Sequence, residues 1–177
     1  MDFTHRLARP ADMPALERVM EAAIRGLLPA FLPPEKVAAS FAVMGLDTQL
    51  IADGTYFILE QGGAIAGCGG WSRRATLFGG NHTAGRDARL LDPATEAARI
   101  RAMYTAPAFA RRGVGRAILR LCEDAARAEG FTRAELGATA GGEPLYRACG
   151  YAGIERLDVP TPGGVTVPIA RMGKALI

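Results

Sequence analysis

Apolar residues recur along the chain with helical spacing at two places. Each stripe follows the i, i+3, i+4, i+7 pattern that puts its members on one face of a helix. The first predicts a helix after Asp12, whose carboxylate we expect to cap the first turn. The second predicts a helix from Val114 to a glycine cap at Gly130, with Glu123 and Arg127 paired on its solvent face. The stripes are Leu16, Val19, Met20, Ala23, Ile24 and Leu27, and Val114, Ala117, Ile118, Leu121, Cys122 and Ala125.

Between these helices the pattern changes to the short, β-branched or alternating runs that are typical of strands. Residues 56–60 ("YFILE") and 64–71 ("AIAGCGGW") flank the turn "QGG" and predict a hairpin. Further strands are expected at 5–9, 98–105 and 132–138, a final hairpin at 153–159 and 165–172, and shorter helices at 34–44 and 143–149. No internal repeat or linker interrupts this order, so we expect a single mixed α/β domain over residues 1–177.

Residues 72–96 differ from the rest of the chain because they are rich in Gly and Asn and show little periodicity. The segment is too long for a simple turn. A segment of this kind in a small domain is either functional or simply mobile.

Composition narrows the class of protein. Hydrophobic residues make up 49% and charged residues 22% of the 177, which is typical of a globular chain. The net charge of +3 comes from scattered arginines, so we expect no nucleic-acid partner. The chain shows neither a signal peptide nor an apolar run long enough to span a bilayer, and we expect no membrane contact. Three widely spaced cysteines indicate reduced thiols in the cytoplasm and no metal site.

The stretch "ARRGVGRAILRL" at residues 110–121 places Gly113 and Gly115 between a strand and the second predicted helix. The glycines could serve backbone geometry alone. A helix N-terminus also offers unpaired N–H groups and partial positive charge, and missing Cβ atoms would let an anion approach. The spacing matches neither the phosphate loop that ends in Gly-Lys-Ser/Thr nor the dinucleotide fingerprint. The pattern therefore favours a different pyrophosphate ligand.

The segment "IRAMYTAPAFARRGVGRAILRLCEDAARAEGF", followed by "LYRACGY", resembles the Gcn5-related N-acetyltransferase (GNAT) family. The family pattern is a strand, a Pro, and Gln/Arg-x-x-Gly-x-Gly/Ala opening a helix, with the Gln/Arg position here occupied by Ala110. Its later Tyr-x-x-x-Gly-Phe/Tyr signature is matched by Tyr146, Gly150 and Tyr151. The resemblance covers nearly the whole chain, least well at 72–96. It implies the GNAT-like acyl-CoA N-acyltransferase fold, a mostly antiparallel central sheet flanked by helices.

The resemblance also implies acetyl-CoA as cosubstrate. Its pantetheine arm is expected to pair with the backbone of Met103, Tyr104 and Thr105. The N–H of Tyr104 is expected to hold the tetrahedral oxyanion. The pyrophosphate is expected on the backbone N–H groups of Arg111, Arg112, Gly113, Val114, Gly115 and Arg116.

Acetyl transfer to an amine requires two proton movements, and the resemblance gives a residue for one of them. Tyr146 is the expected acid for the departing thiolate, because a phenol stays protonated at pH 7. The alternative for Tyr146 is a core aromatic beside Leu145.

The base that deprotonates the amine is not identified by the sequence. Many relatives carry Glu on the strand before the glycine loop, but the matching positions here are Arg99 and Arg101, which cannot accept a proton. A water chain is one alternative; side-chain candidates are Glu96, Glu60, Asp87 and His82. We expect substrate contacts in residues 25–35 and 73–85. Glu21 and Trp71 are weaker candidates, since each also fits a structural role.

The sequence thus predicts an acetyl-CoA-dependent N-acetyltransferase that acetylates a primary amine of a small molecule by direct attack. Two alternatives remain: a protein or peptide N-acetyltransferase, and a non-catalytic CoA-binding regulator. The sequence leaves a homodimer open.

Overall fold

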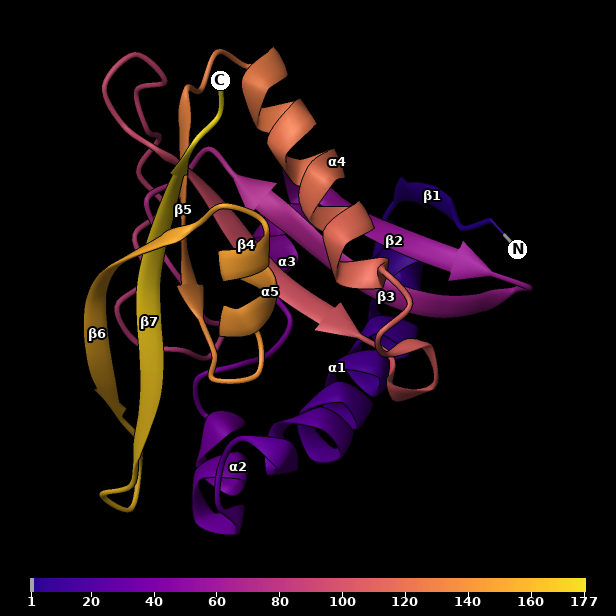
Figure 1. The fold of residues 1–177 in the computed structure, drawn as a ribbon, viewed down its shortest axis with the longest axis vertical. Coiled ribbons are helices and arrows are strands. Elements are labelled where there is room, and N and C mark those ends of the chain that lie inside the picture. The colour runs from indigo at the N-terminus through magenta and orange to yellow at the C-terminus, as the bar shows by residue number, and fades with distance from the viewer. Residues whose placement is uncertain (1) are drawn as a thin grey trace.

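The computed structural model describes residues 2–177, in which seven strands form one mixed sheet (Figure 1). The strand order is β1-β2-β3-β4-β5-β7-β6, and neighbouring strands are antiparallel except for β4 and β5. The strands are β1 (Thr4–Leu7), β2 (Tyr56–Gln61), β3 (Ala64–Ser72), β4 (Ala98–Thr105), β5 (Arg133–Ala138), β6 (Ala152–Pro160) and β7 (Thr166–Ala175). The mostly antiparallel sheet expected from the sequence is confirmed.

Helices cover both faces of this sheet. The apolar stripe of α4 packs with Tyr146 of α5 on one face, and those of α1 and α3 pack on the other. The helices are α1 (Met13–Leu27), α2 (Pro34–Ser40), α3 (Thr48–Ala52), α4 (Val114–Ala128) and α5 (Glu143–Ala148). No helix in residues 2–177 is both long enough and apolar enough to cross a membrane.

A bulge in β4 changes which of its side chains face which helix layer. The register against β3 shifts between Cys68 and Gly70, so one β3 residue opposes two on β4. Ala102 takes up the extra residue with a left-handed φ of 51°. Ile100 and Met103 therefore both contact the α4 layer, although strict alternation would separate them. Tyr104 faces the α1 layer instead.

Strands β4 and β5 separate after a short contact. Their parallel pairing is limited to Ala98 with Ala134 and Arg99 with Glu135. Beyond this point β5 continues its pairing with β7 up to Ala138, whereas β4 bulges and stays with β3. Figure 1 shows the two strands diverging toward their arrowheads. The C-terminal half of β4 is thus left without a strand partner on its β5 side.

Most predicted elements are present with small boundary changes, but two details of capping and burial are wrong. Asp12 does not cap α1; its carboxylate accepts from the Arg9 N–H at 2.7 Å and from the Arg6 guanidinium at 2.8 Å. Glu123 does pair with Arg127, at 3.7 Å, but it is 6% exposed rather than solvent-facing and also pairs with Lys174 of β7 at 3.0 Å. The second predicted helix turns its buried face toward Leu119 and Ala126 as well.

Two further differences from the predicted elements concern α2 and α3, and a third observation concerns segment 72–96. The predicted helix 34–44 ends four residues early, at Ser40, and α3 was not predicted at all. The segment 72–96 is held to the body of the protein by a two-point ion pair of Arg74 with Asp53, at 2.7 and 3.0 Å, and by the Thr48 N–H, which donates to Asn81 Oδ1 at 3.0 Å. Within the segment, Arg74 forms a bridge with Leu90. Its contacts therefore argue for a fixed role rather than simple mobility.

Candidate functional site

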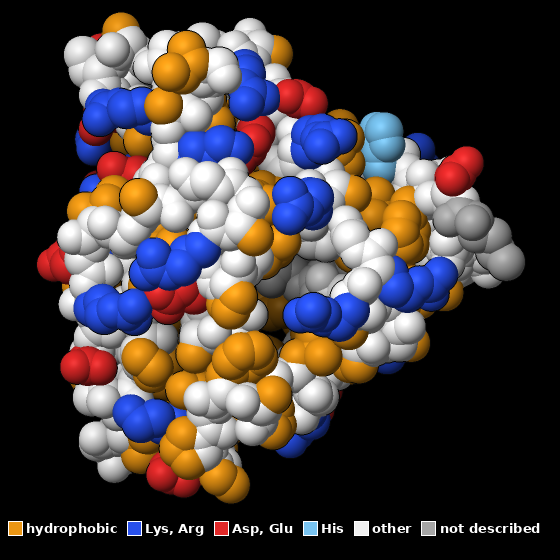
Figure 2. Space-filling model, viewed as in Figure 1, with side chains coloured by type: hydrophobic (Ala, Val, Ile, Leu, Met, Phe, Trp, Pro, Cys, Tyr) orange, Lys and Arg blue, Asp and Glu red, His pale blue; other side chains and the backbone are white. Residues whose placement is uncertain are grey.

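The gap between β4 and β5 contains a cavity of about 850 Å³. It is lined by the end of β4, the start of α4, α5, the end of α1 and residues 77–79. Figure 2 shows a hollow on this face bordered by basic and hydrophobic side chains. The cavity volume suits a small-molecule site.

The glycine stretch forms one wall of this cavity. Gly113 is the N-cap of α4 with a left-handed φ of 83°, a conformation that disfavours any residue with a Cβ. No side chain caps the helix, so its first N–H groups are free to bind an anion. A Cβ at Gly113 would meet nothing within 4 Å, which leaves open space in front of these donors. The local geometry fits a phosphate-binding helix start.

Gly115 has a different reason for lacking a side chain. A Cβ there would lie 2.6 Å from Leu145 Cδ2, so the glycine lets α5 pack closely on α4. Of the two glycines, Gly113 is the one with open space beside it, although both line the cavity with Val114.

The three arginines around the glycines divide into two groups. Arg111 and Arg116 line the cavity and have no ion pair or side-chain hydrogen bond with any of residues 2–177. Arg112 does not line it: its guanidinium donates to Gln61 Oε1 at 2.7 Å and lies 5.0 Å from the centre of the Phe109 ring. Of the three arginines in this stretch, two therefore lie at the cavity.

The end of β4 forms the floor, with Met103, Tyr104 and Thr105 all lining the cavity. The Ala106 N–H donates to Ala66 O of β3 at 2.9 Å. Backbone groups alternate sides along a strand, so the Tyr104 N–H also points to β3 and the Thr105 N–H points away from it. The expectation that the Tyr104 N–H holds an oxyanion is therefore wrong, and the Thr105 N–H is the outward-facing donor.

Tyr146 of α5 lies at the same cavity and is 7% exposed. Its ring packs edge-on against Tyr151, with ring centres 5.9 Å apart. Its hydroxyl has no hydrogen-bond partner within residues 2–177. Burial raises the pKa of Tyr146, so its hydroxyl is protonated at neutral pH and can donate. The ring serves the core while the hydroxyl remains available.

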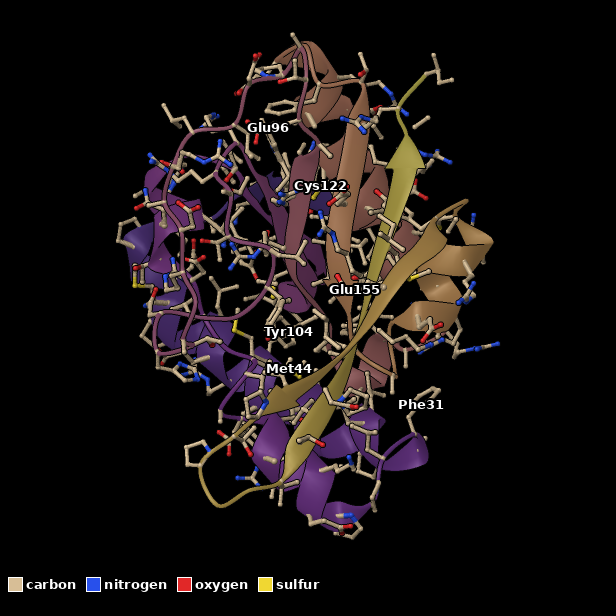
Figure 3. All side chains as sticks on the ribbon, turned by 90° about the vertical axis from the view of Figure 1, so that its left-hand side faces the viewer. Phe31, Met44, Glu96, Tyr104, Cys122 and Glu155 are labelled. Carbon is tan, nitrogen blue, oxygen red and sulfur yellow. The ribbon has the colours of Figure 1, made fainter. Side chains whose placement is uncertain are left out.

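The side chains proposed as bases lie elsewhere. Glu96 pairs with Arg89 at 2.9 Å and Glu60 with Arg6 at 3.1 Å. His82 Nε2 contacts Phe41 O at 2.8 Å, and Asp87 is exposed. None of the four lines the cavity, and Figure 3 shows Glu96 well away from Tyr104. Three of the four lie in segment 72–96, whose path the sequence does not show, and Glu60 lies on β2.

The two weaker candidates are structural as well. Trp71 is 2% exposed and packs edge-on against Phe131 at 5.9 Å. Glu21 forms an exposed ion pair with Arg25 on α1. The segments chosen for substrate contacts do reach the cavity, through residues 26–28, 30 and 31 and through 77–79.

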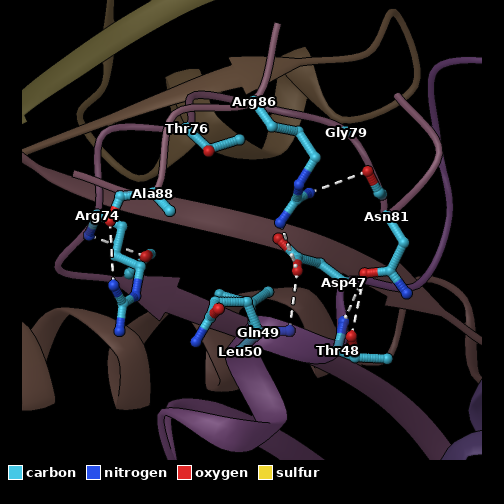
Figure 4. A network of polar contacts seen from close by, with 12 residues as sticks. Asp47, Thr48, Gln49, Leu50, Arg74, Thr76, Gly79, Asn81, Arg86 and Ala88 are labelled. Atoms are coloured by element: carbon cyan, nitrogen blue, oxygen red, sulfur yellow. Dashed lines mark hydrogen bonds and ion pairs between the residues drawn. The ribbon is translucent and has the colours of Figure 1, made fainter. Parts of the chain in front are cut away.

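Arg101 is a further functional candidate. In the sequence it is notable only because it stands at a position where many relatives carry Glu, and it cannot accept a proton. It lines the cavity but is 2% exposed, held by Asp47 Oδ2 at 2.9 Å, Gly79 O at 2.6 Å and Thr76 O at 3.3 Å. Burial lowers the pKa of Arg101, and the Asp47 carboxylate opposes that shift. Figure 4 shows Asp47 also held by Arg86 and by the Gln49 N–H.

The charged residues of the cavity wall are all of one sign. Arg101, Arg111 and Arg116 line it, and no Asp, Glu or His among residues 2–177 does. The same part of the chain also holds no group of three His, Cys, Asp or Glu able to bind a metal. The arrangement can bind anions and donate a proton, but it offers no side-chain base.

Comparisons with known proteins agree with this geometry. The model of the acetyltransferase (GNAT) family matches residues 21–151. A structure described as a GCN5-related N-acetyltransferase (Aminotransferase, Class-II) from Rhodopseudomonas palustris superposes with a TM-score of 0.72 at 19% identity, covering 99% of this chain and 96% of that one.

Two further solved structures share the fold. The PaiA N-acetyltransferase of Thermoplasma acidophilum, in complex with coenzyme A, gives a TM-score of 0.65 at 11% identity over 99% of both chains. The ribosomal-protein-S18-alanine N-acetyltransferase of Escherichia coli gives 0.60 at 19%, covering 99% of this chain and 94% of that one. No curated protein matches the sequence.

Proposed function

This chain belongs to the acetyltransferase (GNAT) family, and on that premise we propose that it transfers the acetyl group of acetyl-CoA to a primary amine of a small molecule by direct attack. The proposal rests on one cavity at which three features meet. They are the N-terminus of α4, which no side chain caps, the end of β4, which has no strand partner on its β5 side, and the Tyr146 hydroxyl, which has no hydrogen-bond partner in residues 2–177. These are a binding site for a pyrophosphate, a pairing edge for an extended amide chain and a proton donor.

The start of α4 holds the pyrophosphate of acetyl-CoA. The free N–H groups behind Gly113 supply short-range donors, and the positive end of a 15-residue helix favours the anion. Arg111 and Arg116 add charge from side chains that have no competing carboxylate. The side chain of Arg112 is already engaged with Gln61 and contributes little.

The end of β4 orients the pantetheine arm. Its outward-facing backbone groups at Thr105 have no strand partner, because β5 has already diverged. An extended amide chain can occupy this position by β-augmentation. The Thr105 N–H is then the strand donor placed to stabilise a developing oxyanion.

Proton transfer is divided between Tyr146 and solvent. The Tyr146 hydroxyl donates a proton to the departing thiolate. An amine with a lysine-like pKa of about 10.4 costs about 4.6 kcal/mol to deprotonate at pH 7. Since the wall supplies no side-chain base, water carries this proton away.

A non-catalytic CoA-binding regulator is the second candidate, favoured by the absence of a carboxylate from the cavity wall of residues 2–177. A peptide acetyltransferase is the third. The cavity of about 850 Å³ favours a small acceptor over a folded protein surface.

Calorimetry with acetyl-CoA, followed by thiol release across a panel of small amines and N-terminal peptides, separates these functions. The proposal expects acetyl-CoA binding and faster thiol release with small amines. Absence of acetyl-CoA binding contradicts it. Binding without transfer to any amine favours the regulator, and transfer confined to peptides favours the peptide enzyme.

A further inference from the structure

The three arginines of the cavity are not equally available to bind the acceptor, which is the second ligand beside acetyl-CoA. Arg111 and Arg116 flank the start of α4, where the proposed pyrophosphate neutralises them. Arg101 comes from β4 before the bulge, beside Phe78 and Gly79, and is the remaining cation on the wall. Its surroundings therefore determine which acceptors the cavity prefers.

Arg101 is fixed in one orientation. Its Nη2 donates to Asp47 and Gly79, and its Nη1 donates to Thr76. Its Nε is buried and has no hydrogen-bond partner in residues 2–177. A buried donor without an acceptor costs about 1–3 kcal/mol. Because Arg101 lines the cavity while its Nε is closed to water, a ligand oxygen gains this bond where a small shift of the wall opens the Nε to the cavity. The unpaired Nε thus points to a missing anionic or carbonyl acceptor.

Charge balance favours an anion over a neutral acceptor. Asp47 is the carboxylate facing Arg101, and it also pairs with Arg86 at 2.9 Å. The cluster of two arginines and one aspartate therefore keeps one net positive charge next to the cavity. Three of the five guanidinium N–H groups are used, so two remain, one on Nε and one on Nη1. Two donors suit a carboxylate better than a phosphate, which requires several.

The neighbouring wall is apolar. Val43, Met44, Phe78 and Ile169 line the cavity near Gly79, and Val43, Phe78 and Ile169 pack in one cluster. A ligand held at Arg101 therefore lies against hydrocarbon rather than against polar side chains. This wall fits an aliphatic or aromatic side chain carried by the same small molecule.

We propose that the acceptor is a free amino acid or close analogue with an apolar side chain, whose carboxylate is bound by Arg101. This inference rests on the proposed acetyltransferase function and deepens it. Arg101 acts as a specificity residue: it positions the acceptor through its carboxylate and takes no part in proton transfer.

Matched acceptor pairs test the inference. Leucine, methionine and phenylalanine are each compared with their amides, which keep the amine and side chain but lack the carboxylate. The expected result is a kcat/KM at least about tenfold higher for the acids. The amides have the less basic amine, so intrinsic reactivity works against this result.

Two variants locate the effect. Arg101→Gln is expected to bring the acid-to-amide ratio close to 1. Arg86→Gln removes a cation from the same Asp47 but not from the cavity wall, and is expected to leave the ratio unchanged. Equal use of acids and amides by the wild type overturns the inference, as does a ratio that survives Arg101→Gln.

A binding measurement covers the case in which Arg101→Gln does not fold. Calorimetry of the wild-type protein saturated with CoA should show tighter binding of N-acetyl-leucine than of N-acetyl-leucinamide. Equal binding overturns the inference. Acetylation of amides without any acid preference leaves the proposed function standing, whereas loss of acetyl-CoA binding removes both.

Discussion

The two basic ends of the cavity are built in opposite ways. At the start of α4, Arg111 and Arg116 are exposed and have no partners in residues 2–177. At β4, Arg101 is 2% exposed and held at three oxygens. Exposed, mobile charges attract an anion over a distance but fix it poorly, while a buried, oriented guanidinium discriminates between close analogues. Under the proposed function, the start of α4 therefore supplies affinity for acetyl-CoA, and Arg101 supplies selectivity among acceptors.

The largest effect is expected from removing the carboxylate that holds the buried end. Asp47→Ala leaves the Arg101 guanidinium buried without its counter-ion, and should lower the free energy of unfolding by about 3–5 kcal/mol. Asp53→Ala is the matched control, since Arg74 remains partly hydrated and the loss should stay below about 1 kcal/mol. Urea unfolding measures both, and similar losses would show that Arg101 is not dependent on Asp47.

The second effect concerns Tyr146, which shares the cavity with both ends. Tyr146→Phe keeps the ring contact with Tyr151 but removes the donor, and should lower kcat about 100-fold or more. The dissociation constant of acetyl-CoA should change little. Steady-state kinetics and calorimetry check the two quantities separately; an unchanged kcat would return Tyr146 to a purely structural role.

Backbone geometry at the exposed end is expected to matter next. Gly113→Ala places a Cβ at a left-handed φ, a strain of about 1–2 kcal/mol that displaces the helix donors and should weaken acetyl-CoA binding about tenfold. Gly130→Ala imposes similar strain at the other end of α4, where φ is 91°, and should leave binding unchanged. Equal weakening by both variants would mean that helix stability, not donor placement, controls affinity.

Side-chain charge at the exposed end should give a smaller and salt-dependent effect. Arg111→Gln and Arg116→Gln should each raise the acetyl-CoA dissociation constant about two- to fivefold at low salt, and less at high salt. Arg112→Gln is the control, because its side chain lies outside the cavity. Calorimetry at two ionic strengths tests this, and salt-independent losses would contradict the diffuse electrostatic role.

The smallest expected effect is a loss of stability in acid, caused by the Arg74–Asp53 pair that serves above as the control. The Arg74 guanidinium lowers the pKa of Asp53, so the pair stabilises the fold above the unfolded-state pKa of about 3.9. That contribution is lost as the pH falls below about 4 and the carboxylate becomes protonated. Between pH 5 and the acid limit of folding, the free energy of unfolding should therefore fall by up to about 1 kcal/mol more in the wild type than in Asp53→Asn. Urea unfolding at a series of pH values measures this difference.

How far the sequence could predict the site depends on how local each feature is. The helix after Gly113, the strand Ala98–Thr105 and the position of Tyr146 follow from short-range patterns, and the structure contains them. The burial of Glu123 does not, because its partner Lys174 is far away in the chain. The base candidates failed for the same reason: ion pairs such as Glu96 with Arg89 form within a loop whose path the sequence does not show.

The sequence by itself determined the strands, the helices other than α3 and the glycine-bearing helix start, because periodicity and turn residues act over a few neighbouring positions. Two motifs added the resemblance to the family. The tertiary structure alone decided the direction of the Thr105 N–H, the separation of β4 from β5 and the burial of Arg101. These depend on a bulge and on Asp47, which reaches Arg101 across 54 positions of the chain. Through that contact Arg101, which the sequence shows only as a residue that cannot act as a base, becomes a buried guanidinium held in one orientation.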